Sequence, residues 1–198
     1  HPLGATVLSV NYKDSGKWPL TPDGYGFSLV LRNPNASPNP NNPGNWRAST
    51  YPEGSPGADD SAPVIPEIVI NEALTHTDPP LLDSIELHNP TPSGVSVAGW
   101  FLTDDRNVPT KYRIPSSTII PAGSYLVFSE TNFNLAPGAS NSFNLDSHGE
   151  EVYLVSADAG GNLTGYSHGF SFGAAANGVS FGRHVISTGE ERFVAQVS

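Results

Sequence analysis

The sequence predicts an all-β protein, built as a sandwich of short strands. Glycine and proline together make up about a fifth of the 198 residues, yet hydrophobic residues still reach 37%. Short apolar or alternating runs recur at roughly 8–12-residue spacing, which is typical of a sandwich. Glycine or proline also interrupts nearly every window long enough for a stable helix, and both disfavour a helix interior.

The expected strands follow one another along the whole chain. We place them at Thr6–Tyr12, Gly26–Leu31, Ile65–Asn71, Asp83–Asn89, Val95–Thr103, Lys111–Ile114, Ser124–Phe128, Glu151–Ser156, Gly165–Phe172, Gly178–His184 and Arg192–Val197. The segments between them are rich in the residues that favour turns.

Side chains point alternately to the two faces of a strand, so the apolar pattern predicts which face is buried. Ile85 and Leu87 share one face of their strand, and the polar residues between them should face water. Tyr125 and Val127 show the same alternation, so we expect them on a buried face too. Trp100, flanked by glycine and phenylalanine, is the best candidate for a large central core residue. The residues expected to mark the core and the fold are Trp100, Ile85, Leu87, Tyr112, Val152 and Leu154.

A linker is expected at residues 51–66, because this run of Pro, Gly, Asp, Ser and Ala has no apolar periodicity. It separates an N-terminal piece, residues 1–60, from a compact domain at 65–198. A weak internal repeat relates the two. In both, a strand is followed by a glycine turn, a serine-bearing apolar strand and a last aromatic strand. Residues 1–60 therefore resemble the closing strands of a preceding copy.

Composition narrows the classes of partner. The formal net charge is −10, and a field of that sign repels phosphate backbones and anionic lipid surfaces. No run approaches the ~18 consecutive apolar residues that a membrane helix needs. We therefore expect neither nucleic-acid binding nor membrane insertion. The absence of cysteine, the few lysines and the many small polar residues favour an extracellular or cell-surface bacterial protein.

Several sequence blocks, in this order, resemble the lamin tail domain family. They are Ile70-Asn71-Glu72, Asp83-Ser84-Ile85-Glu86-Leu87-His88-Asn89-Pro90, Gly99-Trp100-Phe101-Leu102-Thr103-Asp104, Lys111-Tyr112-Arg113-Ile114-Pro115, Ile120-Pro121-Ala122-Gly123-Ser124-Tyr125-Leu126-Val127 and Gly149-Glu150-Glu151-Val152-Tyr153-Leu154. Together they cover roughly residues 65–198. The resemblance implies an immunoglobulin-like sandwich without catalytic residues, of a kind found in secreted or surface multidomain proteins of bacteria.

Glu72, Asp83, Glu86 and His88, with His76 nearby, form the densest group of candidate metal ligands. Carboxylates would favour Ca²⁺ and imidazoles Zn²⁺. Alternation places Asp83 on the face opposite Glu86 and His88, so a solvated strand face is the favoured interpretation. We expect no cofactor, with Ca²⁺ as the weak alternative.

A second acidic stretch, Asp146 to Glu151, precedes a strand. Its sequence only partly follows the alternating oxygen ligands of a calcium loop. A tight turn with Gly149 at a positive φ is the favoured interpretation.

Aromatic residues of the N-terminal piece are the remaining binding candidates. The residues Trp18, Tyr25, Trp46 and Tyr51 either form a stacking platform for sugars or peptides, or, with Trp18 and Trp46 as anchors, pack to hold a small β fragment in place. We favour packing, because two or three strands alone rarely hold together in water.

Three functions remain. The first is a non-catalytic extracellular interaction or adhesion module that binds a protein or glycan at the cell surface. The second is a structural subunit that self-associates head-to-tail through residues 1–60, giving a filament or fibre. The third, a metal-dependent hydrolase, has the least support, since the chain lacks cysteine, a Gly-x-Ser-x-Gly elbow and a His-Glu-x-x-His helix.

Overall fold

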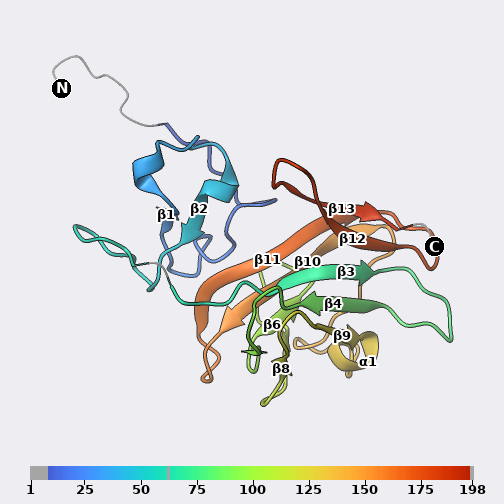
Figure 1. Cartoon of the computed structure of the whole chain (residues 1–198). Helices are drawn as coiled ribbons and strands as arrows, with labels where there is room; N and C mark the ends of the chain where they lie inside the picture. Colours follow the sequence, from blue (N-terminus) through green and yellow to red (C-terminus); the bar gives the residue numbers. More distant parts are fainter. Residues whose placement is uncertain (1–8, 62, 197–198) are drawn as a thin grey trace. The chain divides into compact units, whose positions relative to one another are not determined.

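The computed structural model describes residues 9–61 and 63–196, and its elements are drawn in Figure 1. These residues form two compact units. One unit holds the N-terminal residues up to Val64 together with Thr164–Tyr166. The other holds Ile65–Leu163 and the residues from Ser167 onward. Each unit is described by itself below.

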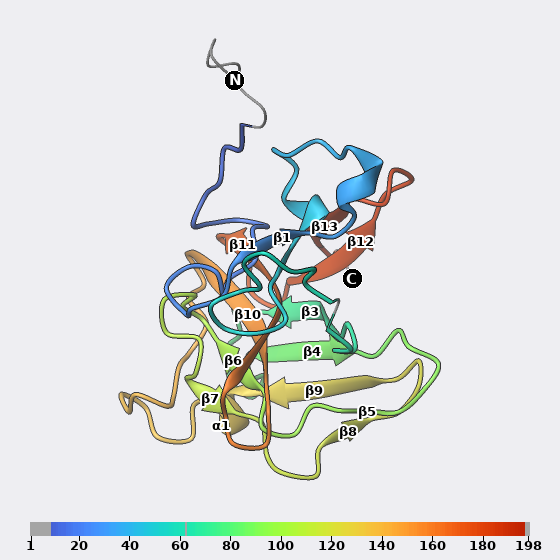
Figure 2. The same cartoon turned by 90° about the vertical axis from the view of Figure 1, so that its left-hand side faces the viewer.

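The larger unit contains a five-stranded antiparallel sheet with the spatial order β13-β12-β3-β4-β9. Its strands are β3 (Val69–Leu74), β4 (Ser84–His88), β9 (Tyr125–Ser129), β12 (Ser180–Val185) and β13 (Glu191–Ala195). Figure 2 shows β3, β4 and β9 side by side. Strands β9 and β13 are the two edges of this sheet.

A second antiparallel sheet has the order β11-β10-β6-β7. Its strands are β6 (Phe101–Thr103), β7 (Tyr112–Arg113), β10 (Gly149–Ala157) and β11 (Leu163–Gly173). A two-stranded sheet pairs β5 (Val95–Ser96) with β8 (Ile119–Ile120). Together the sheets form an immunoglobulin-like β-sandwich, with 33% of residues in strands and 5% in helices. The predicted fold class is confirmed.

The core of this unit draws fully buried aliphatic side chains from both sheets. They are Ile68, Ile70, Ile85, Leu87, Leu102, Val152 and Leu154. Trp100 is buried as predicted, whereas Tyr112 is only partly covered and its ring meets that of Phe128 at a centroid distance of 6.0 Å. Burial raises the pKa of the Tyr112 hydroxyl, since its charged form is poorly solvated there.

One polar bridge crosses between the two sheets. His168 on β11 accepts a hydrogen bond at Nδ1 from the Ile70 backbone N–H on β3, at 3.0 Å. Its Nε2 therefore carries the ring hydrogen and donates it to Glu191 on β13, at 3.1 Å. Glu191 also accepts from Arg183 on β12. The hydrogen bond from His168 is the largest of the influences that lower the pKa of Glu191, to about 2.

The predicted strand Val95–Thr103 is two strands, β5 and β6, which is a correction to the sequence analysis. Gly99 lies between them at φ +81°, a conformation that side-chain-bearing residues rarely adopt. A Cβ atom there would also approach the Asp158 carbonyl oxygen to 3.2 Å. The strand therefore ends at Gly99, although the apolar pattern of the sequence continues on both sides of this glycine.

The expected burial of Tyr125 and Val127 is wrong. Both side chains are 53% exposed, and the residue that β9 buries is Phe128. The registers Glu86↔Val127 and His88↔Tyr125 place them on the outer face of the five-stranded sheet. Tyr125 and Val127 do share one face of β9, as the alternation predicts, but that face is the exposed one.

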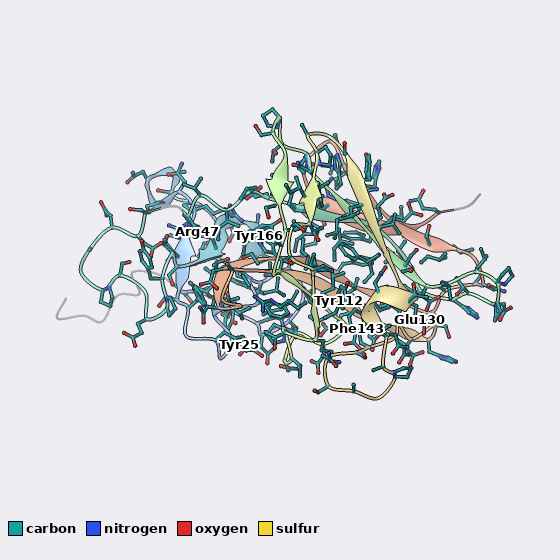
Figure 3. The ribbon with its side chains drawn as sticks, turned by 90° about the horizontal axis from the view of Figure 1, so that it is seen from below. Tyr25, Arg47, Tyr112, Glu130, Phe143 and Tyr166 are labelled. Carbon is teal, nitrogen blue, oxygen red and sulfur yellow. The ribbon has the colours of Figure 1, made fainter. Side chains whose placement is uncertain are left out.

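A short helix, α1 (Glu130–Phe133), follows β9 and was not expected. The Ser129 backbone N–H, at its start, donates to the Asn132 side chain at 2.9 Å. Phe133 is fully buried and stacks on Phe143, with ring centroids 4.6 Å apart. Figure 3 labels Glu130 and Phe143 in this region. Four residues are too few for helical periodicity to be visible in the sequence.

The N-terminal unit contains a two-stranded antiparallel sheet, β1 (Leu29–Leu31) and β2 (Trp46–Ala48). The loop between them holds two 3₁₀ turns at Pro34–Ala36 and Pro43–Asn45. Thr21 Oγ1 donates to the Gly165 carbonyl at 3.0 Å within the same unit. The predicted strand at 6–12 is wrong for residues 9–12, which form no strand, and its remainder lies outside the described residues. Its interpretation as part of a repeat stays a prediction.

Replacing Leu154 by alanine should test the core directly. Leu154 is fully buried on β10, so the variant should lose about 2–5 kcal/mol of unfolding free energy through lost burial and a residual cavity. Urea unfolding followed by tryptophan fluorescence measures the change. The matched control is Leu135→Ala, at a site 82% exposed, where a change within about 0.5 kcal/mol is expected. Equal losses in the two variants would contradict the assigned core.

Candidate functional site

The structure separates the predicted metal ligands instead of gathering them. Glu72 and Glu86 face each other across β3 and β4. Glu72 accepts a hydrogen bond from the Ser180 hydroxyl, and Glu86 accepts one from the Asn71 amide at 2.8 Å. Both carboxylates are thus satisfied by neutral donors. His88 stacks on Tyr125, with ring centroids 4.4 Å apart.

Asp83 lies apart from these residues, just before β4 begins. It is 9% exposed, and its Oδ1 accepts a hydrogen bond from the Thr77 hydroxyl at 2.7 Å. Burial raises the pKa of the Asp83 carboxyl, against the opposing effect of that hydrogen bond. Asp83 shares the buried parity of Ile85 and Leu87, so it does not join Glu86 and His88.

Asp83 instead lines a polar pocket of about 380 Å³. Two segments far apart in the sequence form its wall: residues 75–77, which follow β3, and residues 144–148, which precede β10. In Figure 1 the loop from β3 to β4 projects from the end of the sheet. The pocket therefore brings together the two acidic stretches that the sequence analysis treated separately.

The hydrogen bonds of the pocket residues define their available atoms. His76 donates from Nδ1 to the Ala175 carbonyl at 2.7 Å, because a carbonyl can only accept. Its Nε2 is then an acceptor when the ring is neutral. Asp146 Oδ1 accepts from the His148 backbone N–H at 2.8 Å and lies 3.0 Å from His148 Nδ1. The backbone bond is the main influence that lowers the pKa of Asp146.

Glu150 lies beside this pocket, at the end of the predicted turn. Burial raises its pKa to about 7, partly offset by the hydrogen bond from the Asp146 backbone N–H. The neighbouring charges of Asp104 and Asp146 raise it further. The predicted positive φ of Gly149 is found, at +120°. The turn is therefore as expected, but its carboxylate is half-buried.

Within residues 9–61 and 63–196, no three His, Asp or Glu side chains come together in a way that could hold a metal ion. Two carboxylates line the pocket, and one of its two imidazoles, that of His148, is 90% exposed and turned onto Asp146. The described side chains thus present no ready set of calcium ligands.

The outer face of the five-stranded sheet is the second candidate surface. Tyr125 and Val127 lie on its edge strand β9, beside a shallow depression of about 160 Å³ that Val127, Glu72 and Glu86 help to line. On an outer face, alternation would place polar residues at these two positions. The sequence pattern does not reveal this surface, because an apolar alternating pair has the same spacing whichever face of the sheet it occupies.

Of the four aromatic candidates of the N-terminal unit, Tyr51 is 68% exposed, whereas the two tryptophans are not. Trp18 and Trp46 are buried, with ring centroids 6.3 Å apart. Trp46 also donates from its indole N–H to the Pro40 carbonyl at 2.9 Å. Tyr25 is half-buried. These positions match the packing interpretation, in which large apolar rings order a small β fragment.

Comparison with known families gives one decisive match. The profile of the lamin tail domain family matches residues 61–170, more than half of the chain. The chain belongs to the lamin tail domain family. No curated protein and no solved structure matches it significantly.

The matched region of this lamin tail domain runs from just before β3 into β11. It therefore contains the polar pocket and the edge strand β9, whereas β12 and β13 follow it. The family is a non-enzymatic, immunoglobulin-like one. None of the helices in the described part of the chain has the length and apolar character required to cross a membrane.

Glu150→Gln should change how stability depends on pH. The folded-state pKa of about 7 exceeds the ordinary 4.5, so the folded state holds the proton more tightly. The stability that the folded state gains from the protonated Glu150 carboxyl is fully present below about pH 4.5 and is lost as pH rises through 7. The glutamine variant lacks this loss and should be about 1–2 kcal/mol more stable than wild type at pH 8, after allowance for solvent screening.

Urea unfolding at pH 5 and pH 8 measures the effect, with Glu53→Gln, at an exposed position, as the control. Parallel pH profiles for the wild type and Glu150→Gln would contradict the assigned burial of this carboxyl.

Proposed function

We propose that this lamin tail domain is a non-catalytic adhesion module, which attaches a larger secreted or surface protein to a protein partner outside the cell. The family supports a binding or structural role over catalysis. The strong negative charge suits a partner with basic surface groups.

One observation carries this proposal: the outward-facing apolar pair Tyr125 and Val127 on the edge strand β9. Edge strands offer unpaired backbone N–H and C=O groups, so a partner strand can add to the sheet there. Main-chain hydrogen bonds would supply affinity, and side chains on the outer face would supply selectivity. Tyr125 is well suited, since tyrosine is enriched where protein surfaces meet.

A second candidate function is head-to-tail self-assembly through residues 1–60. Among the described residues, β1 and β2 pair only with each other. Such a two-stranded sheet is seldom stable by itself. A second copy could extend it, and a head-to-tail contact need not close.

The adhesion proposal predicts that Tyr125→Ser/Val127→Ser weakens partner binding at least tenfold. The reason is that an exposed apolar contact and its covered edge are lost together, while no buried side chain changes. Surface plasmon resonance of the full chain against a panel of purified extracellular matrix proteins measures the effect, with a glycan array run in parallel.

The control is Ile119→Ser/Leu135→Ser, which removes two exposed apolar side chains outside the five-stranded sheet. Binding that survives in the β9 variant would refute the assigned surface, as would binding to the glycan array alone. Light scattering tests the alternative function on both serine variants and on a chain that lacks residues 1–60. A particle mass that increases with concentration in both serine variants, but not in the shortened chain, would favour self-assembly instead.

A further inference from the structure

The edge strand β9 has backbone hydrogen-bonding groups that face away from the sheet. In an antiparallel pair, alternate residues direct their N–H and C=O groups toward the neighbouring strand. The Ser124 carbonyl, just before β9, accepts from the Asn89 N–H at 3.0 Å. The Glu130 N–H, just after it, donates to the Asp83 carbonyl at 2.8 Å. The even-numbered residues of β9 therefore face β4, and the odd-numbered ones face the open side.

A separate contact agrees with this alternation. The Ser129 N–H donates to the Asn132 side chain at 2.9 Å, away from β4. Within residues 9–61 and 63–196, no group forms a hydrogen bond with the backbone N–H or C=O of Tyr125 or Val127. The side chains of these two residues are each 53% exposed. Tyr125 and Val127 thus offer open main-chain groups and exposed side chains at the same edge.

The other edge of the five-stranded sheet differs from β9. Strand β13 contains Glu191 and Arg192, and charged side chains on an edge strand discourage pairing with another chain. From Tyr125 to Ser129, β9 has no charged residue and no proline. Its register with β4 is also regular, without a bulge. These are the features of an edge that can accept another strand.

The charges beside β9 indicate which side chain such a strand would present. Glu86 is the cross-strand neighbour of Val127, and Glu72 is that of Glu86. Like charges directly opposite each other are unfavourable, and no ion pair within the described chain joins either carboxylate to a lysine or arginine. A partner residue opposite Val127 would lie about 10 Å from Glu86, two strand spacings away. A long basic side chain can span that gap across the small valine.

We propose that β9 accepts an added strand from a partner protein, which pairs with the backbone of Tyr125 and Val127 and places a lysine or arginine opposite Val127. The inference rests on the proposed adhesion function for the existence of the partner, and it specifies the partner's chemistry. Only an extended segment can satisfy alternate N–H and C=O groups along an edge. The basic side chain reaches Glu86 over the shallow depression that Val127 helps to line, and it offsets the repulsion between Glu86 and Glu72.

A strand peptide tests this proposal without any matrix protein. The probe is a short capped peptide in which threonine alternates with valine and one central lysine. Titration of the full chain, followed by NMR, should show saturable binding with a Kd on the order of 1 mM, as expected for a fragment-sized ligand. The amides of Tyr125 and Val127 should shift most and become protected from exchange. The amides of Leu126 and Phe128 should change little, because they already face β4.

Val127→Pro tests the backbone pairing. It removes an N–H that faces the open side, so no bond to β4 is lost, and proline is tolerated on an edge strand. The variant should fold but bind the peptide at least tenfold more weakly. Ala195→Pro is the matched control on β13. The Gln196 N–H donates to the Ser180 carbonyl of β12, so alternation directs the exposed Ala195 to the open side, and this variant should bind like the wild type.

Glu86→Gln tests the basic residue and leaves the backbone intact. Glutamine keeps an oxygen that accepts from the Asn71 amide and removes the charge. The wild type should bind a norleucine version of the probe severalfold more weakly than the lysine probe, whereas Glu86→Gln should bind both alike. Glu53→Gln, at an exposed position of the N-terminal unit, should keep the wild-type preference. The amide spectrum of each variant checks its folding.

No saturable shift at β9, equal peptide binding by Val127→Pro and Ala195→Pro, or equal wild-type affinity for the lysine and norleucine probes would overturn the proposal. Dimerisation that Val127→Pro abolishes would overturn it too, since the occupant would be a second copy. Peptide binding without matrix binding would reject the adhesion function and support the added strand. Matrix binding that Tyr125→Ser/Val127→Ser abolishes but Val127→Pro preserves would support adhesion and overturn the added strand.

Discussion

The packing of the two large sheets against each other is the constraint on which the structure depends. Each sheet contributes fully buried aliphatic side chains, such as Ile85 from β4 and Leu154 from β10. Removal of this apolar surface from water is the main favourable contribution to folding. His168 adds specificity, because its ring must accept from Ile70 and donate to Glu191 at once. A partly buried ring with two fixed partners favours one alignment of the sheets.

That packing determines where recognition can occur. Inward positions on the strands are committed to the core, so chemistry is left to the outer faces, the edge strands and the loops at the sheet ends. The apolar pair on β9 uses an outer face and an edge. The polar pocket uses two loops, residues 75–77 and 144–148, which the strands bring together from positions about 70 residues apart. Both surfaces follow from strand positions that the core has already fixed.

Much of the fold was predictable because its signals are local. Period-two alternation predicted the buried face of β4, and the ordered family blocks indicated the sandwich. The errors came from features without a local signal. Gly99 breaks a strand through a positive φ, which an apolar pattern does not encode. The short helix α1 depends on the burial of Phe133 against Phe143, a contact made only in the folded chain.

The candidate site was less predictable for a related reason. Its acidic residues were all recognised, but they were grouped by closeness in sequence, and the sheet groups them differently. Asp83 lies near Asp146 at one pocket, whereas Glu72 and Glu86 face each other on the sheet. The open backbone groups of β9 carry no sequence signal at all, since every residue except proline has the same ones. Only the place of β9 at the edge of the sheet distinguishes them.

Native-state amide hydrogen exchange tests the central claim most directly. If sheet-to-sheet packing fixes the structure and leaves recognition to outer faces, edge strands and loops, the amides of Val152–Val155 and Ile85–Leu87 should exchange only by global unfolding. The amides of residues 76–82 should then exchange orders of magnitude faster, through local opening. Equal protection of that loop and these strands, or fast exchange at Leu154, would contradict the account.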